Sequence, residues 1–382
     1  MSAAAHDHSH ASDERRGPAT APLPPLVDVL DRARVVALPM RVRFRDVTER
    51  EAMLVEGPRG WAEFSPFPEY GDAEAASWLR STLEMGWSGA PAPLRASVPV
   101  NATVPAVPPA EVAGVLERFP DCRTVKVKVG PSRTTPSSLD DDVARVSAVL
   151  DAIPGARIRT DTNRAWSVGE AYAAAKVLGR VVAEAGGIFE YLEQPCATVP
   201  ELAQLRAEIA AGAERGEIVG GTLPGGAIAV AADESIRRAE DPLLVVHAGG
   251  ADRAVVKAPP LGGPRRLLGI AAELRGLGLD VTVSSALDTA VGMGAGLAAA
   301  AALPDREDGT IAACGLGTGG FFAEDVVAAP RAIEGGELDA APVIPDEARL
   351  AGLAAADDRR DWWIARLRRC YDVLAGEAAS TT

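Results

Sequence analysis

The segment 124–130, TVKVKVG, places two lysines one residue apart. Side chains alternate between the two faces of a β-strand, so Lys126 and Lys128 would share one face and the valines the other. Two neighbouring ammonium groups repel each other, and this repulsion together with burial can lower a lysine pKa to about 7–8. Such a lysine can act as a base near neutral pH. On an exposed edge strand the same lysines would only discourage aggregation.

Acidic side chains end three of the apolar runs that follow. Asp161 stands in RTDTN, Glu193 in YLEQP and Asp233 in AADES. If these runs are parallel strands of one barrel, their carboxyl ends meet at one mouth. Three carboxylates gathered there would repel each other and take up protons unless a cation joined them. Oxygen ligands without histidine or cysteine suit a hard ion such as Mg²⁺, so we predict that these acids are metal ligands.

Lys257 ends the later run VVK and would lie on the other side of this metal from the lysine pair. Lys128 is nearer to its strand end than Lys126. We therefore predict that Lys128 is the base and that Lys126 is the neighbour that tunes its pKa. The remaining polar candidates at this mouth are Asn101, Arg159, Asn163, Ser284 and Ser285.

Composition limits the classes of partner. The chain has 382 residues, and its 39 basic and 53 acidic residues leave a formal charge of −14. That charge argues against a nucleic-acid groove or an anionic membrane surface as the binding partner. The apolar run 290–303 is too short to span a bilayer, and the N-terminal residues lack the apolar core of a secretory signal. We therefore expect a cytoplasmic protein.

Histidine and cysteine usage narrows the chemistry further. Three of the four histidines lie within the first ten residues, which leaves His247 alone in the rest of the chain. A histidine-based triad or zinc site is therefore disfavoured, and proton transfer falls to Lys, Asp, Glu or Tyr. The four cysteines are far apart and form no C-x-x-C pair, so we expect reduced thiols.

The order of patterns along the chain predicts four regions. Residues 1–27 form a Pro/Ala/polar leader that we expect to be disordered. Residues 28–97 are typical of a small α+β domain, with two or three antiparallel strands and a turn at 57–60. From 98 to 320, β-branched runs alternate with helical segments, which indicates a closed parallel barrel. Residues 321–382 end in a helix that we expect to pack back on the N-terminal domain.

The order of the site residues along this barrel resembles the enolase superfamily, in the branch of the muconate-lactonizing enzymes. The shared pattern is K-x-K on the second barrel strand, acidic metal ligands on the third, fourth and fifth, and a lysine on the sixth, within roughly residues 30–330. The resemblance implies a modified TIM barrel, (β/α)7β, with an α+β capping domain formed by the N-terminal region and the C-terminal segment. It also implies Mg²⁺, or Mn²⁺ in its place, because members of that superfamily pair a lysine or histidine base with such ions.

Eight short motifs give a more specific resemblance within this superfamily. They are VNATVPA, VKVKVG, DTNRAW, YLEQPC, DESIRRAEDP, PLGG, SSALDTAVG and CGLGT. They are similar to a subgroup of lyases that dehydrate 2-succinyl-6-hydroxy-2,4-cyclohexadiene-1-carboxylate in menaquinone biosynthesis. The resemblance implies that Lys128 removes the α-proton and returns it to the departing hydroxyl, while the metal stabilises an enediolate. Lys257 would add a cation–π contact of about 0.5–2 kcal/mol. The residues expected around the substrate, directly or one layer behind it, are Ser284, Ser285, Gly315, Gly317, Asn163 and Arg159.

Two other functions remain open at this point. An N-succinylamino acid racemase or dipeptide epimerase of the same superfamily also needs the K-x-K pair and the opposing lysine, there as two bases on opposite faces. A member of the fold that had lost catalysis would lack at least one of the lysines or carboxylates, and this chain keeps them all. We expect a small dianionic carboxylate as the partner, rather than nucleic acid or membrane. The sequence leaves the oligomeric state open and allows a monomer.

Overall fold

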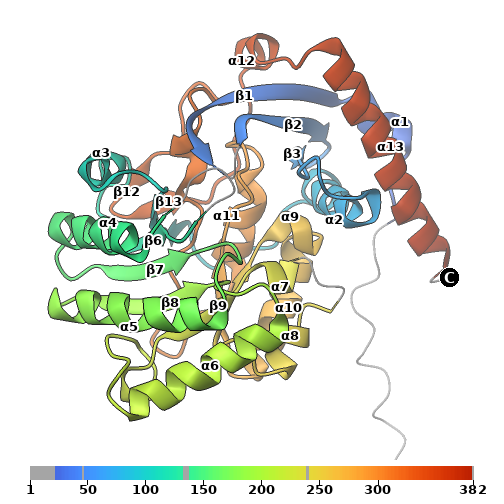
Figure 1. Ribbon diagram of the computed structural model, residues 1–382. Helices are drawn as coiled ribbons and strands as arrows, with labels where there is room; N and C mark the ends of the chain where they lie inside the picture. Colours follow the sequence, from blue (N-terminus) through green and yellow to red (C-terminus); the bar gives the residue numbers. More distant parts are fainter. Residues whose placement is uncertain (1–21, 45–46, 132–136, 238–240, 381–382) are drawn as a thin grey trace, which may run out of the picture.

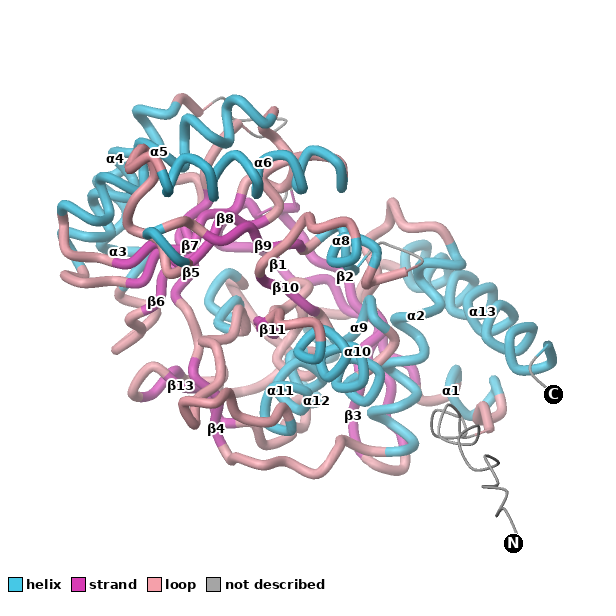
Figure 2. Tube along the Cα trace, turned by 90° about the horizontal axis from the view of Figure 1, so that it is seen from below, coloured by secondary structure: helices cyan, strands magenta, loops and turns pink. Residues whose placement is uncertain are grey.

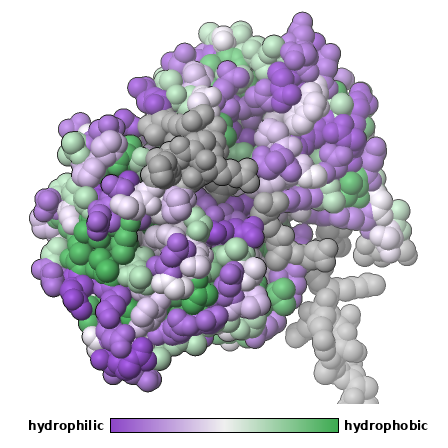
Figure 3. All heavy atoms as spheres, viewed as in Figure 1, coloured by the Kyte–Doolittle hydropathy of each residue, from purple (hydrophilic) through white to green (hydrophobic). Residues whose placement is uncertain are grey.

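The structure is a computed structural model, and it describes residues 22–380 apart from 45–46, 132–136 and 238–240. Most of the predicted leader therefore lies outside the described residues. The described chain forms a barrel of parallel strands wrapped by helices, with a smaller layer of strands and helices against it (Figure 1). The face drawn in Figure 3 is largely hydrophilic, and its hydrophobic areas are small and separated. Within the described part of the chain, no helix combines the length and the apolarity needed to cross a membrane.

The barrel contains seven parallel strands, and their order in the sheet follows their order in the chain (Figure 2). The strands are β5 (Ala102–Val104), β6 (Thr124–Lys128), β7 (Arg157–Asp161), β8 (Ile188–Glu193), β9 (Ala229–Ala232), β10 (Arg253–Val256) and β11 (Asp280–Val283). The last segment of the barrel makes only isolated bridges, from Cys314 to Val100 and from Gly315 to Ser284. These bridges join the two ends of the curled sheet, so the predicted (β/α)7β barrel is confirmed with a short closing segment.

Helices cover the outer face of the barrel, and three of those whose first residues the structure describes begin at capping boxes. These helices are α4 (Leu139–Ala152), α5 (Val168–Glu184) and α6 (Val199–Glu214). In each, the hydroxyl of the residue before the helix accepts a hydrogen bond from a backbone N–H in the first turn, and the acidic side chain of that turn accepts one from the backbone N–H of the hydroxyl residue. All three lie in the region 98–320, where the sequence predicts helical segments between the strands. The other barrel helices are α3 (Val112–Leu116), α7 (Glu234–Arg237), α8 (Leu244–His247), α9 (Ala258–Leu261), α10 (Pro264–Gly276) and α11 (Met293–Ala302).

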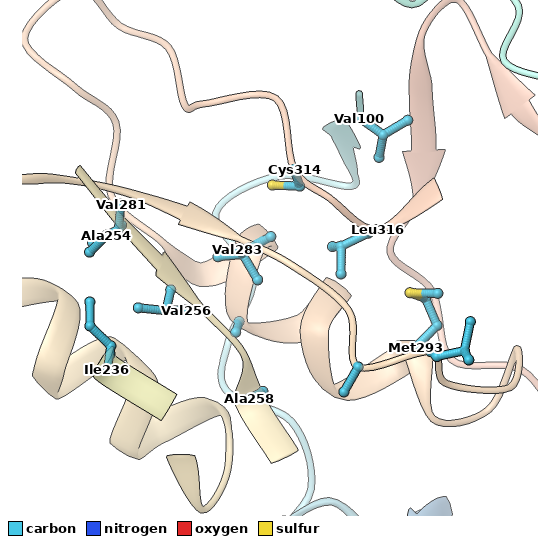
Figure 4. Packing of buried hydrophobic residues seen from close by; sticks show 14 of the residues in the cluster. Val100, Ile236, Ala254, Val256, Ala258, Val281, Val283, Met293, Cys314 and Leu316 are labelled. Atoms are coloured by element: carbon cyan, nitrogen blue, oxygen red, sulfur yellow. The ribbon is translucent and has the colours of Figure 1, made fainter. Parts of the chain in front are cut away.

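Branched side chains fill the layer between the strands and these helices. Val125 and Val127 of β6 are completely buried. Figure 4 shows the same layer around Val256, Val283 and Met293, where β10 and β11 meet α11. A separate group fills the inside of the barrel: Tyr191, Ala229, Ala231 and Val255. The valines of TVKVKVG therefore face the helices, and the lysines between them face the barrel interior.

The smaller layer, which we call the capping layer, is built on three antiparallel strands. β1 (Ala33–Phe44) pairs with β2 (Val47–Gly57), which pairs with β3 (Gly60–Phe64). Three helical segments complete it: α1 (Leu26–Leu30), α2 (Asp72–Leu83) and the π-helix η1 (Glu84–Ser88). Two helices from the C-terminal end of the chain, α12 (Glu347–Gly352) and α13 (Asp357–Ser380), lie beside this layer in Figure 1. Of these, α13 packs against α2.

Glu51 of β2 ties α13 to the capping layer. Its carboxylate accepts hydrogen bonds from Arg359 at 2.6 and 2.7 Å and from Trp363 Nε1 at 2.9 Å. The buried Trp363 ring also meets the Phe64 ring edge-on, with centroids 5.8 Å apart. The last helix thus returns to the N-terminal strands as the sequence predicts, while the domain boundaries stay a prediction.

Part of the predicted C-terminal segment packs elsewhere. β12 (Ile333–Glu334) and β13 (Glu337–Asp339) form a small antiparallel sheet with β4 (Ser97–Pro99). The β-branched run 98–104 at the start of the predicted barrel is therefore split between two sheets. The physical reason is that β4 finds its backbone partner in β13, whereas β5 pairs with β6 in the barrel.

Replacing Trp363 by alanine should weaken the attachment of α13. A fully buried tryptophan that loses its ring leaves a large cavity, and such changes cost about 3–5 kcal/mol of unfolding free energy. Here the hydrogen bond to Glu51 is lost as well. Urea unfolding followed by circular dichroism measures the effect, and Trp362→Ala, at the half-buried neighbour, is the control that should lose much less. Equal losses in the two variants would contradict the packing argument.

Candidate active site

The lysine pair of β6 is not on an edge, because β6 lies between β5 and β7 in the sheet. In the register of these strands Lys126 pairs with Arg159 and Lys128 with Asp161. Asp161 in turn pairs with Glu193 of β8. Paired positions of parallel strands point to the same side, so all these side chains face the barrel interior. The edge-strand explanation for K-x-K is therefore wrong.

A hollow with about 430 Å³ of empty space lies at the carboxyl ends of the strands. The predicted site residues in its wall are Lys126, Asp161, Glu193, Asp233, Lys257, Ser284, Ser285 and Gly315. The rest of the wall is formed by Phe67, Thr103, Ala286, Leu287 and Thr318. Lys128 adjoins the hollow through Asp161, with Nζ 3.6 Å from Asp161 Oδ1, and Gly317 begins the neighbouring 3₁₀ turn η4 (Gly317–Phe321).

Lys126 lies between two of the three carboxylates. Its Nζ donates a hydrogen bond to Glu193 Oε1 at 3.0 Å and lies 3.5 Å from Asp161 Oδ2. Burial would lower the pKa of Lys126, but the charges of Glu193 and Asp161 outweigh burial and raise that pKa above its usual value. The repulsion expected from Lys128 therefore does not dominate at Lys126. In this arrangement Lys126 is a fixed positive charge beside the acids.

Asp233, directly after β9, is held by two cations. Lys257 Nζ donates to both carboxylate oxygens, at 2.7 and 2.6 Å, and Arg237 Nε donates to Oδ1 at 2.9 Å. Arg237 also donates to the Tyr70 hydroxyl at 2.8 Å, which connects this acid to the capping layer. Lys257 follows β10, four strands from β6 around the sheet, so the predicted placement of cations on two sides of the acids is what the structure contains.

The acids meet the chemical requirements for a divalent cation. Burial and the charges of Asp161 and Asp233 raise the pKa of Glu193, against the lowering effect of Lys126. The charged form of Glu193 is therefore disfavoured in this desolvated position even with Lys126 beside it, and a cation bound directly to the carboxylate would favour it. Over the described ranges, no three His, Cys, Asp or Glu side chains are grouped closely enough to hold a metal at once, because the lysines lie among the acids. The residue types fit a hard cation, and the lysines would have to move apart from the acids to admit it.

Lys128 has a different set of contacts from Lys126. Its Nζ donates a hydrogen bond to Asn163 Oδ1, and the Lys128 carbonyl accepts one from Arg145 Nη1 at 3.0 Å. Asn163 has a left-handed backbone, with φ of 48°, and its own N–H binds Asp161 Oδ1 at 3.0 Å. The loop after β7 thus holds the Lys128 ammonium group near the end of its strand, which is the position predicted for the base.

Arg159 lies beneath the hollow instead of in its wall. It is almost fully buried and donates to Glu190 Oε2 at 2.6 Å and to Asn101 Oδ1 at 3.0 Å. The same guanidinium lies over the Tyr191 ring, 4.9 Å from its centroid. Arg159 can therefore reach a substrate only through other residues, which is the indirect role that the sequence suggests and which stays a prediction.

Replacing Glu190 by glutamine should destabilise the protein in a pH-dependent way. Burial would raise the pKa of Glu190, but Arg159 and Arg157 outweigh it and lower the pKa to about 2. A lowered folded-state pKa stabilises the fold above the unfolded pKa of about 4.3, and this stabilisation disappears as the pH falls toward 2. We expect Glu190→Gln to lose about 3 kcal/mol of unfolding free energy at pH 7 and clearly less at pH 3. Urea unfolding at both pH values tests this, with exposed Glu214→Gln as control; a loss that does not depend on pH would contradict it.

Several residues of the site are not predicted from the sequence. Thr103 pairs in register with Lys126, so its position on the first barrel strand was a usable signal. Leu287 and Thr318 stand inside the quoted motifs SSALDT and GLGT, and Thr318 shares a hydrogen bond of 2.8 Å with Ser285. Arg237 lies in DESIRR, where nothing in its spacing distinguishes it from a surface arginine.

Two family models match the chain. The model described as enolase N-terminal domain-like matches residues 35–86, and the one described as enolase C-terminal domain-like matches residues 110–347. Among solved structures, muconate lactonizing enzyme from Pseudomonas fluorescens superposes with a TM-score of 0.65 at 20% identity, covering 85% of this chain and 98% of that one. For 2-chloromuconate cycloisomerase from Rhodococcus opacus the TM-score is 0.64 at 22% identity, with the same coverage. The chain belongs to the enolase superfamily, and its predicted fold is confirmed.

Relatives of higher sequence identity show which family of this superfamily the chain belongs to. The chain is 51% identical to o-succinylbenzoate synthase of Mycobacterium marinum, over 94% of this chain and 97% of that one. It is also 51% identical to o-succinylbenzoate synthase of Mycolicibacterium smegmatis, over 92% of this chain and 99% of that one. Within the superfamily the chain is therefore a member of the o-succinylbenzoate synthase family. It is an enzyme, and membership implies dependence on a divalent metal.

Proposed function

We propose that this protein is a cytoplasmic, Mg²⁺-dependent o-succinylbenzoate synthase. It would remove water from 2-succinyl-6-hydroxy-2,4-cyclohexadiene-1-carboxylate to give o-succinylbenzoate in menaquinone biosynthesis. The observation that carries the proposal is the gathering of K-x-K, three carboxylates and an opposing lysine around one hollow. Relatives of that name at 51% identity over nearly the whole chain support the choice of substrate.

Lys128 is the proposed general base. Its unprotonated amine would take the proton from the ring carbon that bears the carboxylate, and the electron pair of that C–H bond would become part of the new aromatic ring. Until the hydroxyl leaves, this electron pair is shared with the substrate carboxylate, and the C–O bond to the hydroxyl breaks in the following step. The ammonium group of Lys128 then donates its proton to the leaving oxygen on the same face, which releases water and restores the base. Asn163 would orient Lys128 through the hydrogen bond between their side chains.

Asp161, Glu193 and Asp233 are the residues proposed to hold the metal ion. When bound, a divalent ion supplies Lewis-acid stabilisation of the negative charge that develops on the substrate carboxylate. The choice of Mg²⁺ over a softer ion follows from the three carboxylate ligands. Lys126, whose pKa is raised by these acids, would remain protonated and add positive charge beside the developing anion.

The other side of the hollow would bind the rest of the substrate. Lys257 supplies a cation opposite Lys128 and would stabilise the delocalised anion of the ring by a cation–π contact. Ser284 and Ser285 follow β11, and the bridge from Ser284 to Gly315 brings the GLGT backbone beside them. These groups, with Gly317, are the proposed contacts of the succinyl tail.

The proposal is tested by an assay with and without metal. Purified protein treated with a chelator should give no aromatic product from the cyclohexadiene substrate, and added Mg²⁺ should restore the rise in absorbance. Activity that persists after complete chelation would refute the metal assignment. The comparison of Mg²⁺ with Mn²⁺ at equal concentrations would show which ion supports the faster reaction.

An N-succinylamino acid racemase is the second candidate, because the lysines on two sides of the hollow could serve as a pair of bases. Polarimetry with an N-succinylamino acid separates the two activities. Racemisation with a higher kcat/KM than dehydration would overturn the proposed substrate while leaving the metal and the lysines in their roles.

A further inference from the structure

Leu287 has an unusual backbone for its residue type. Its φ is +65°, in the left-handed region that glycine and asparagine adopt readily and that bulky side chains such as leucine seldom adopt. Such a conformation is strained and persists where the surroundings hold it firmly. Leu287 is also part of the wall of the hollow, together with Ala286 and Ser285 before it. The strain is therefore located in a segment that shapes the space for the substrate.

The groups that hold this segment come from the capping layer. Arg50 of β2 is buried and donates a hydrogen bond from Nε to the Leu287 carbonyl at 3.1 Å. The same guanidinium donates to the Ser65 carbonyl and lies over the Phe67 ring, 4.3 Å from its centroid. Because Phe67 also lines the hollow, Arg50 connects two parts of the wall that come from different layers of the molecule.

Glu63 of β3 binds Thr289, two residues after the strained Leu287. Its carboxylate accepts hydrogen bonds from the Thr289 backbone N–H at 3.1 Å and from the Thr289 hydroxyl. Ser65 donates to its other oxygen at 2.5 Å. A side chain at Gly292 would place its Cβ 2.4 Å from this carboxylate, so the glycine leaves the space that Glu63 occupies. Two buried side chains of the capping layer therefore hold the chain at Leu287 itself and two residues after it, at Thr289.

We propose that Arg50 and Glu63 are positioning residues that, through Leu287, set how tightly the hollow binds the succinyl part of the substrate. This inference rests on the proposed function, because it concerns the tail of that substrate. The reacting groups on β6 to β10 receive no hydrogen bond from either residue in the part of the chain that the structure describes. Loss of either residue should therefore weaken tail binding much more than it slows the proton transfer.

The test compares two stable ligands, o-succinylbenzoate and benzoate, of which only the first has the tail. In Arg50→Lys and Glu63→Gln, we expect the Kd of o-succinylbenzoate to rise about tenfold or more and that of benzoate to change less than threefold. The KM for the cyclohexadiene substrate should rise in parallel, with kcat within about threefold of wild type. A general loss of structure would instead raise the Kd of both ligands and lower kcat at the same time.

The matched control is Glu51→Gln, since Glu51 is a neighbouring carboxylate of the capping layer that binds Arg359 and lies away from the hollow. It should leave the ratio of the two Kd values unchanged. If Arg50→Lys fails to fold, Glu63→Gln carries the test of the positioning residues. Leu287→Gly separately tests the Leu287 side chain: glycine adopts a positive φ without strain, so the same rise in the Kd of o-succinylbenzoate alone is expected. Glu63→Gln keeps the size of the side chain and replaces one acceptor oxygen by a donor amide, which would face the donors Ser65 or Thr289.

The outcomes separate this inference from the proposed function. Wild-type protein that neither binds o-succinylbenzoate nor forms it would refute the function, and the inference with it. Wild-type protein that does both, together with variants that bind the two ligands in the wild-type ratio, would refute the inference alone.

Discussion

The Lys128→Ala variant should fold and lose about 10⁴-fold in kcat, the upper end of what general acid–base catalysis provides. The loss is large because the same amine both removes the α-proton and returns it to the departing hydroxyl, so neither step keeps its proton carrier. Product formation is followed by absorbance, and circular dichroism shows whether the variant is folded. Lys126, with its raised pKa and its contact to Glu193, cannot take over as the base.

Lys176→Ala is the control for this experiment. Lys176 is 43% exposed and lies 3.8 Å from Glu217 on the outside of the molecule, so its loss should leave kcat unchanged. A Lys128→Ala variant with activity within tenfold of wild type would remove Lys128 from the mechanism and direct attention to Lys257.

The Glu193→Gln variant should bind Mg²⁺ at least about 100-fold more weakly, because even partners of metal ligands change affinity by 10–100-fold. The raised pKa of Glu193 shows how poorly its charge is tolerated without further positive charge, so this ligand gains much from a cation. Titration calorimetry with Mg²⁺ measures the affinity independently of turnover. We expect kcat/KM at fixed Mg²⁺ to fall by about 10²–10³-fold, as for the loss of one electrostatic contact to the developing charge.

Glu190→Gln offers a matched control on the same strand. Glu190 lies beneath the hollow, paired with Arg157 and Arg159 at 2.5 and 2.6 Å, and is no proposed ligand. It should reduce stability and leave the Mg²⁺ affinity within a few-fold. Equal losses of affinity in the two variants would mean that the acids act on the fold and not on the metal.

The orientation of the two lysines could be predicted from TVKVKVG because backbone geometry alone sends alternate side chains of a strand to opposite faces. The convergence of Asp161, Glu193 and Asp233 was equally predictable, since the carboxyl ends of parallel strands meet at one mouth. Both predictions use local rules that tertiary contacts do not change. The superfamily resemblance adds the roles of these residues, which the local rules do not provide.

Other features depend on which partners meet in three dimensions. The hydrogen bond from Lys126 to Glu193 depends on the rotamers of two long side chains, and no spacing in the sequence predicts those rotamers. The positive φ of Leu287 has no signal in its residue type. The segment 311–314 forms no regular strand, and only Cys314 and the following Gly315 pair with the two ends of the sheet, which nothing in the composition of the segment predicts. These are the places where sequence reasoning was wrong or silent.

The contact between Glu51 and Arg359 joins positions 308 residues apart. At translation rates of about 5–20 residues per second, the ribosome needs roughly 15–60 s to add that much chain. The strands around Glu51 leave the exit tunnel early, and the helix that covers them arrives only after the whole barrel has been made. During that interval their apolar face is open to other nascent chains. Chaperones that shield these early segments should therefore raise the yield of folded enzyme in a cell.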